Sequence, residues 1–202
     1  MLHILQQDHF DAARAVTWIL ALALGITVHE FAHAWRADKA GDPTPRSQGR
    51  LSLNPLDHYD PIGSTMILLF GLGWAKPVPV NPFLFRNPRR DQIMVSLWGP
   101  IANLITATIL AVPLRLGIAG PYTDPLLTMI TLNLGLAVFN LIPIYPLDGS
   151  HVLSALLPLD QARRLDAIYH QQGMLLLIVV MLFAGSFVWT VVGALTYVLT
   201  GM

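Results

Sequence analysis

The sequence contains no cysteine and few charged residues. The absence of cysteine among its 202 residues excludes a disulfide-stabilised fold, a thiolate nucleophile and a metal site with cysteine ligands. Charged residues make up only 12% of the chain, about half the share of a typical soluble domain, and the net charge is zero. The chain therefore lacks the basic field that nucleic-acid binding requires. Apolar residues make up 54%, too many for a disordered chain, so the composition indicates a membrane protein.

Long uncharged stretches predict an all-α integral membrane bundle, formed by residues 1–202 as a single domain. A spanning helix needs roughly 20 apolar residues. Stretches of this length predict about four transmembrane helices. The first is not preceded by a basic segment, so we interpret it as a retained anchor and not as a signal peptide. The predicted helices cover about residues 12–36, 92–118, 124–143 and 173–200.

A fifth uncharged stretch, about residues 61–75, is too short to cross a bilayer. At about 1.5 Å per residue it would reach roughly 22 Å, against a hydrocarbon core of about 30 Å. We expect a re-entrant segment. If this segment does not cross, ten of the twelve Lys and Arg residues share one side, which the positive-inside rule assigns to the cytoplasm. The expected location is thus the cell membrane, with several spans.

Two polar segments resemble short strands. Residues 50–54 alternate apolar and polar side chains, and residues 76–81 alternate valine with proline. Both are followed by or end in Asn-Pro, which is typical of turns. They predict either a small β-hairpin or strand element that binds an extended substrate through Val78 and Val80, or two ordinary loops.

The first helix contains the pattern His29-Glu30-Phe31-Ala32-His33. Side chains four residues apart lie on one face of a helix, so both imidazoles can bind one metal ion. Glu30 then lies beside that ion as a general base. Ionisable side chains within a spanning helix are costly, by about 2.5 kcal/mol or more at mid-bilayer, which favours a functional role over a chance match.

A hydrolytic zinc site needs a third protein ligand. Asp148 is the best candidate, because it follows an apolar run that Pro143 and Pro146 interrupt and precedes Gly149. Irregular backbone at membrane depth is tolerated where it lines a cavity. The other histidines are weaker candidates. These are His3, His9, His58, His151 and His170.

Three asparagines lie within apolar stretches. Asn140 either forms a hydrogen bond between helices or donates to the carbonyl oxygen of a substrate during hydrolysis. Asn103 ends the small-residue patch Gly99-Pro100-Ile101-Ala102-Asn103, where a packing role is favoured and contact with substrate is the alternative. For Asn133 we expect a packing role.

Together these motifs resemble the site-2 protease family of intramembrane zinc metalloproteases, in its short form without a PDZ domain. The resemblance rests on the His29–His33 motif, on Gly99–Asn103, and on Asn140-Leu-Ile-Pro-Ile-Tyr-Pro-Leu-Asp148-Gly149. It implies that His29, His33 and Asp148 bind one Zn²⁺ ion. It also implies that Glu30 is the catalytic base and that Asn140 contacts the substrate or the oxyanion.

The resemblance implies hydrolysis of peptide bonds within or near the transmembrane helices of membrane-protein substrates. Membrane lipid is then the other partner, nucleic acid is not, and the oligomeric state is not predicted. The active site is expected toward the cytoplasmic face, because Arg36 closely follows His33. The alternative is a proteolytically inactive membrane protein that binds or transports a metal. The intact Glu30 argues against inactivity, and the uncharged segments 93–114 and 173–202 argue against a transport path.

Overall fold

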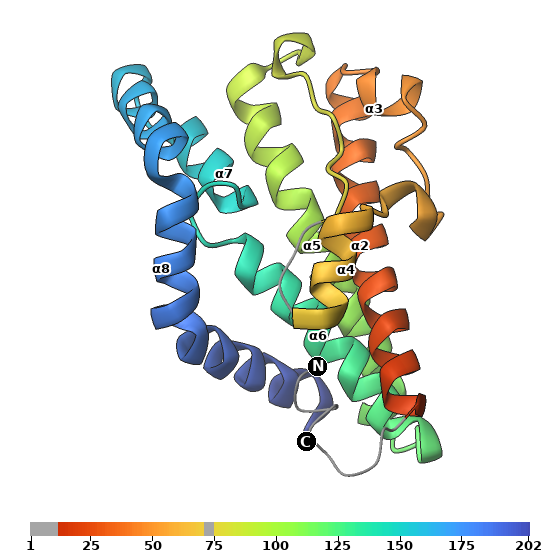
Figure 1. The fold of residues 1–202 in the computed structure, drawn as a ribbon. Coiled ribbons are helices and arrows are strands. Elements are labelled where there is room, and N and C mark those ends of the chain that lie inside the picture. Colours follow the sequence, from red (N-terminus) through yellow and green to blue (C-terminus); the bar gives the residue numbers. More distant parts are fainter. Residues whose placement is uncertain (1–11, 71–74) are drawn as a thin grey trace.

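The computed structural model describes residues 12–70 and 75–202, and helices are the only regular elements in these ranges (Figure 1). In chain order these are α2 (Ala12–Ala40), α3 (Thr44–Ser47), η1 (Pro55–His58), α4 (Pro61–Phe70), η2 (Pro82–Leu84), α5 (Pro88–Arg115), η3 (Gly120–Tyr122), α6 (Thr123–Asn140), α7 (Asp148–Leu156) and α8 (Leu159–Thr200). The prediction of an all-α membrane bundle is confirmed.

Helices α2, α5 and α6 pack against one another and form the centre of the molecule. Small side chains allow this close approach, because without a hydrophobic driving force helix association in lipid depends on tight packing. Helix α7 packs on α5, and α8 contacts α5, α6 and α7. Figure 1 shows that α8 changes direction partway along its length. One core cluster comprises Ala107, Ala111, Leu114, Ala119, Ile130, Leu134 and Val192.

Three helices in the described ranges are long and apolar enough to cross a membrane: Ala12–Ala40, Pro88–Arg115 and Gly120–Asn140. They correspond to the first three predicted spans. The fourth predicted span, residues 173–200, lies in the long helix α8, whose described apolar part, Gly185–Thr200, is shorter. That span stays a prediction.

The predicted re-entrant segment contains the ten-residue helix α4. Its start is capped by Asp60, whose Oδ1 accepts hydrogen bonds from the backbone N–H groups of Ile62 at 3.0 Å and Gly63 at 2.7 Å. Residues 71–74 lie outside the described ranges. Whether the segment enters the membrane stays a prediction.

The predicted β-hairpin is wrong for the described residues, because neither residues 50–54 nor residues 76–81 form a strand. Two prolines, Pro77 and Pro79, remove alternate N–H donors from the second segment. The alternation of valine with proline therefore reflects an extended segment without a ladder of backbone hydrogen bonds. Val80 instead packs against the buried cluster Ala37, Ala40, Phe85 and Val95.

Hydrogen bonds to residues between α2 and α4 hold residues 76–81 in place. The N–H of Lys76 donates to the carbonyl of His58 at 3.0 Å, and the N–H of Asn81 donates to Asp42 Oδ2 at 2.7 Å. Arg50, only 4% exposed, donates to the carbonyls of Lys76 and Pro77. We refer to residues 76–81 as the tethered segment.

Asp42→Ala should loosen the tethered segment. Asp42 is fully buried and also accepts from the N–H of Thr44 at 3.0 Å, so its removal leaves two backbone donors without an acceptor. Each such loss costs about 1–3 kcal/mol. We expect a lower midpoint of thermal unfolding in detergent and faster hydrogen exchange at Asn81. The exposed Asp160→Ala is the control, and equal behaviour of the two variants would refute this account.

Candidate metal centre

Helix α2 carries two buried histidines one turn apart. His29 and His33 are each 8% exposed, and their Nε2 atoms lie 3.0 Å apart. The spacing of four residues places both rings on the same side of the helix, where they face α5. The two ring nitrogens thus point at a common position.

Asp148, the first residue of α7, completes this group. Its Oδ2 lies 3.1 Å from His29 Nε2 and 3.3 Å from His33 Nε2. The same oxygen is buried and makes no hydrogen bond within the described residues. In these parts of the chain, this is the group of three whose ligand atoms lie within 4.8 Å of one another and could hold a metal ion.

The turn between α6 and α7 delivers Asp148 to the histidines. Helix α6 ends at Asn140 and α7 begins at Asp148, and Gly149 lies so close to the turn that a Cβ there would collide with the Leu141 carbonyl and lie 2.6 Å from the Ile142 oxygen. From α8, the Tyr169 hydroxyl donates to the Pro143 carbonyl at 2.6 Å. Burial, and then the nearby Asp166, raise the pKa of Tyr169, which keeps this donor protonated.

The outer nitrogen of each histidine has a fixed partner. His29 Nδ1 lies 2.7 Å from Asn103 Oδ1, and His33 Nδ1 lies 2.8 Å from the Val95 carbonyl. Both partners are acceptors, so both Nδ1 atoms carry hydrogens, and a neutral imidazole then has its lone pair on Nε2. Two lone pairs and the Asp148 carboxylate therefore converge in a buried space. A metal cation would neutralise the charge of this group, and the donor set fits zinc.

Gly99 on α5 makes room for both rings. A methyl group at this position would collide with His33 Nε2 and would lie 2.8 Å from His29 Cε1. The sequence favoured a packing role for the patch that begins at Gly99, with contact between Asn103 and substrate as the alternative. Because Gly99 has no side chain, its backbone lies directly against the two imidazole rings.

Glu30, next to the first histidine, points to the tethered segment. Its Oε2 accepts a hydrogen bond from the N–H of Val78 at 3.1 Å, and its carboxylate interacts electrostatically with His33. Val78, expected as a substrate contact, thus orients Glu30 through its backbone. No sequence signal pointed to this contact across 48 residues.

The remaining candidates lie in other settings. Asn140 is partly buried and donates to the Leu136 carbonyl at 3.0 Å, within its own helix. Asn103 is fully buried, and its side chain points to His29 and not to open space. Among the other histidines, His58 bonds to the Ser52 carbonyl at 2.8 Å. His151 and His170 line a separate polar cavity of about 200 Å³.

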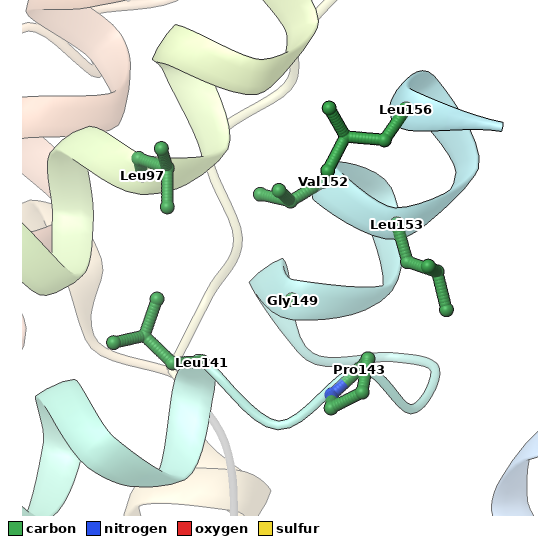
Figure 2. A pocket seen from close by; sticks show the side chains of 7 residues that line it. All are labelled: Leu97, Leu141, Pro143, Gly149, Val152, Leu153 and Leu156. Carbon is green, nitrogen blue, oxygen red and sulfur yellow. The ribbon is translucent and has the colours of Figure 1, made fainter.

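An apolar pocket of about 210 Å³ adjoins the site (Figure 2). It lies between α5, the turn after α6, and α7, and Figure 2 shows Leu97 and Val152 on opposite sides of it. Gly149, the neighbour of Asp148, forms part of the wall. The other lining residues are Leu141, Pro143, Leu153 and Leu156.

Comparison with known proteins agrees with this geometry. A model of peptidase family M50 matches residues 115–184. "Putative zinc metalloprotease YwhC" of Bacillus subtilis is 43% identical over 150 residues, which cover 69% of this chain and 68% of the relative. "Putative zinc metalloprotease Rip2" of Mycolicibacterium smegmatis is 32% identical over 178 residues, which cover 82% of this chain and 64% of the relative. "Zinc metalloprotease MJ0392" of Methanocaldococcus jannaschii is 27% identical over 144 residues, which cover 71% of this chain and 34% of the relative. No solved structure matches this chain.

The fold and the comparisons together define a zinc metalloprotease built into a helical membrane bundle. The chain belongs to peptidase family M50, the site-2 protease family, as its motifs indicated. The expected cofactor, zinc, is confirmed by the zinc metalloprotease relatives and by the His-His-Asp group. The alternative of a metal carrier without protease chemistry is not supported.

Gly99→Ala should abolish stoichiometric zinc binding, because the new methyl group occupies space needed by both imidazoles. The control is Gly135→Ala on α6, where an added Cβ meets nothing within 4 Å. Both changes raise helix propensity by about 1 kcal/mol. Metal analysis of the detergent-purified proteins should give about one zinc per chain for Gly135→Ala and much less for Gly99→Ala. Equal zinc content in the two would contradict the role of Gly99.

Proposed function

We propose that His29, His33 and Asp148 bind the zinc ion and that Glu30 is the general base of peptide hydrolysis. The observation that carries this proposal is the buried Asp148 Oδ2, which lies within 3.3 Å of both Nε2 atoms without a hydrogen bond of its own. A buried carboxylate without a partner is costly, and a divalent cation removes that cost.

Zinc, when bound, supplies positive charge that acidifies water and polarises a peptide carbonyl. Glu30 takes the proton from the attacking water and then gives it to the departing amine nitrogen. The N–H of Val78 holds one carboxylate oxygen of Glu30 and so fixes the direction of the other. The carboxylate thereby meets the water in a defined orientation.

Asn140 is proposed to stabilise negative charge on the substrate carbonyl oxygen. Its amide now donates to the Leu136 carbonyl one turn back in the same helix. Because that bond is local and only partly buried, rotation of the side chain releases the donor at little cost. This role requires such a rotation.

The proposed substrate is a transmembrane helix of another protein, unwound near the cleaved bond. The apolar pocket beside Asp148 supports this proposal, because it suits a large aliphatic side chain of the kind that dominates such helices (Figure 2). The bias of Lys and Arg supports the cell membrane as location, with the site toward the cytoplasm.

Glu30→Gln should retain zinc and lose proteolysis. The amide is almost isosteric and its oxygen still accepts from Val78, but it takes no proton from water. We expect cleavage of a model transmembrane substrate in detergent to fall by at least about 10²–10⁴-fold. The assay compares the product formed by wild type and variant at equal zinc content.

His29→Ala is the matched variant, for which zinc and activity should both disappear. Cleavage by Glu30→Gln at the wild-type rate would exclude Glu30 as the base. Full zinc in His29→Ala would exclude the proposed ligands.

The tethered segment is proposed to pair with the extended substrate through its backbone at Val80. The N–H groups of Lys76, Val78 and Asn81 already have acceptors, and the two prolines have no N–H. The Val80 N–H thus remains as a donor without an acceptor among the described residues. Backbone pairing of this kind needs no particular substrate side chain.

Val80→Pro removes this donor and should raise KM or lower kcat/KM for the transmembrane substrate by roughly 3- to 10-fold, which corresponds to the loss of one hydrogen bond. Val80→Ala keeps the N–H and is the control for the lost packing against Phe85. Zinc content should be unchanged in both. Identical kcat/KM values for the two variants would refute the pairing.

A further inference from the structure

Two asparagines connect His29 to the centre of the bundle. Asn103 on α5 and Asn133 on α6 are both fully buried, and we refer to the pair as the amide relay. Asn103 was expected to pack or to contact substrate, and Asn133 to pack. Neither expectation explains why their hydrogen bonds form a continuous chain that ends at His29.

This chain of hydrogen bonds begins at Asn133. Its Nδ2 donates to the Met129 carbonyl at 2.8 Å, one turn back in α6, which directs Oδ1 toward α5. This Oδ1 accepts from Asn103 Nδ2 at 2.9 Å. The same Nδ2 donates its second hydrogen to the Gly25 carbonyl on α2, also at 2.9 Å.

Both hydrogens of Asn103 are therefore engaged, and its Oδ1 is the atom that faces His29 Nδ1 at 2.7 Å. A flipped Asn103 amide would place its oxygen against two acceptors, Gly25 O and Asn133 Oδ1. It would also direct an N–H group at the ring. In a buried site such contacts are costly, because no water relieves them.

We propose that the amide relay selects the tautomer of His29, with the hydrogen on Nδ1 and the lone pair on Nε2, and so positions this ring to bind zinc. The inference rests on the proposed function only in taking His29 as a ligand. Asn103 and Asn133 are positioning residues that act through His29. Hydrogen-bond partners of ligating histidines commonly change metal affinity by about 10–100-fold.

Tight packing enforces the relay. A Cβ at Gly25 would lie 2.7 Å from Leu136 Cδ1 and 3.5 Å from Asn133 Oδ1, so α2 and α6 approach closely at this level. The relay thus links the three central helices at a level where Gly25 lets α6 approach α2. His33 has no such relay, since its Nδ1 donates directly to a main-chain carbonyl, whose direction is set by α5 itself.

The test compares Asn103→Leu, Asn133→Leu and the smaller Asn133→Ala with Thr106→Val as control. Thr106 is half-buried on α5, one turn after Asn103, and bonds only within its own helix, to the Ala102 carbonyl at 2.8 Å. Chelator competition on the full-length protein in detergent gives the zinc Kd. We expect Kd to rise about 10–100-fold for Asn103→Leu. For the Asn133 variants we expect a smaller rise, because the Gly25 carbonyl still orients Asn103, and for Thr106→Val no change.

A second measurement separates positioning from loss of structure. In zinc-stripped protein with ¹⁵N-labelled histidine, nitrogen chemical shifts distinguish the two tautomers, and His29→Ala identifies the signal of His29. Wild type and Thr106→Val should show hydrogen on Nδ1, and the Asn133 variants should gain the Nε2–H form. Unchanged tautomer and unchanged Kd in folded Asn133→Ala would overturn the inference. The proposed ligands would still stand if His29→Ala had lost its zinc.

Discussion

The structure depends on the convergence of three electron-rich atoms in a largely buried space. The Nε2 atoms of His29 and His33 and the Oδ2 of Asp148 lie within about hydrogen-bonding distance of one another, and with the hydrogen of each neutral imidazole on Nδ1 none of the three is a donor. In a low-dielectric interior their mutual repulsion is large unless a cation lies between them. The rest of the bundle keeps these atoms together: α2 supplies the helical spacing, α5 supplies space at Gly99, and the turn before α7 supplies the carboxylate.

Hydrogen bonds connect the tethered segment both to the loop residues Asp42 and Arg50 and to Glu30 in the site. Asp42 and Arg50 hold the tethered segment at its ends, and between them the N–H of Val78 reaches Glu30. If an extended substrate pairs with that segment as proposed, a movement of the segment would shift the N–H group that holds the Glu30 carboxylate. In the proposed mechanism, substrate pairing at Val80 and orientation of Glu30 by Val78 would be coupled through the same short segment.

Local sequence patterns predicted the parts of the site that depend on local geometry. Helical periodicity placed His29 and His33 together, and the proline-broken, glycine-containing stretch correctly marked an irregular turn at Asp148. The alternation of valine with proline in residues 76–81 wrongly indicated a strand, because prolines produce an extended backbone without the N–H donors that a sheet needs. The contacts of Asn103 and Asn133 span 74 and 30 residues, and a single sequence gives no register between helices from which to derive them. The packing expectation for Asn133 identified its burial but not its direction.

Metal binding between α2 and α7 would have a thermodynamic consequence. Any ligand that binds only the folded state stabilises it, and zinc bound by the proposed ligands would join residues of α2 to the start of α7. The buried residues of helix α7 are Gly149 and Ser150. Zinc bound by this group would therefore tie the start of α7 to α2 in addition to the contacts of α7 with α5 and α8. The same packing that brings Asn133 to Asn103 also fixes the His29 ring, so the contacts of the three central helices orient this histidine without any contribution from α7.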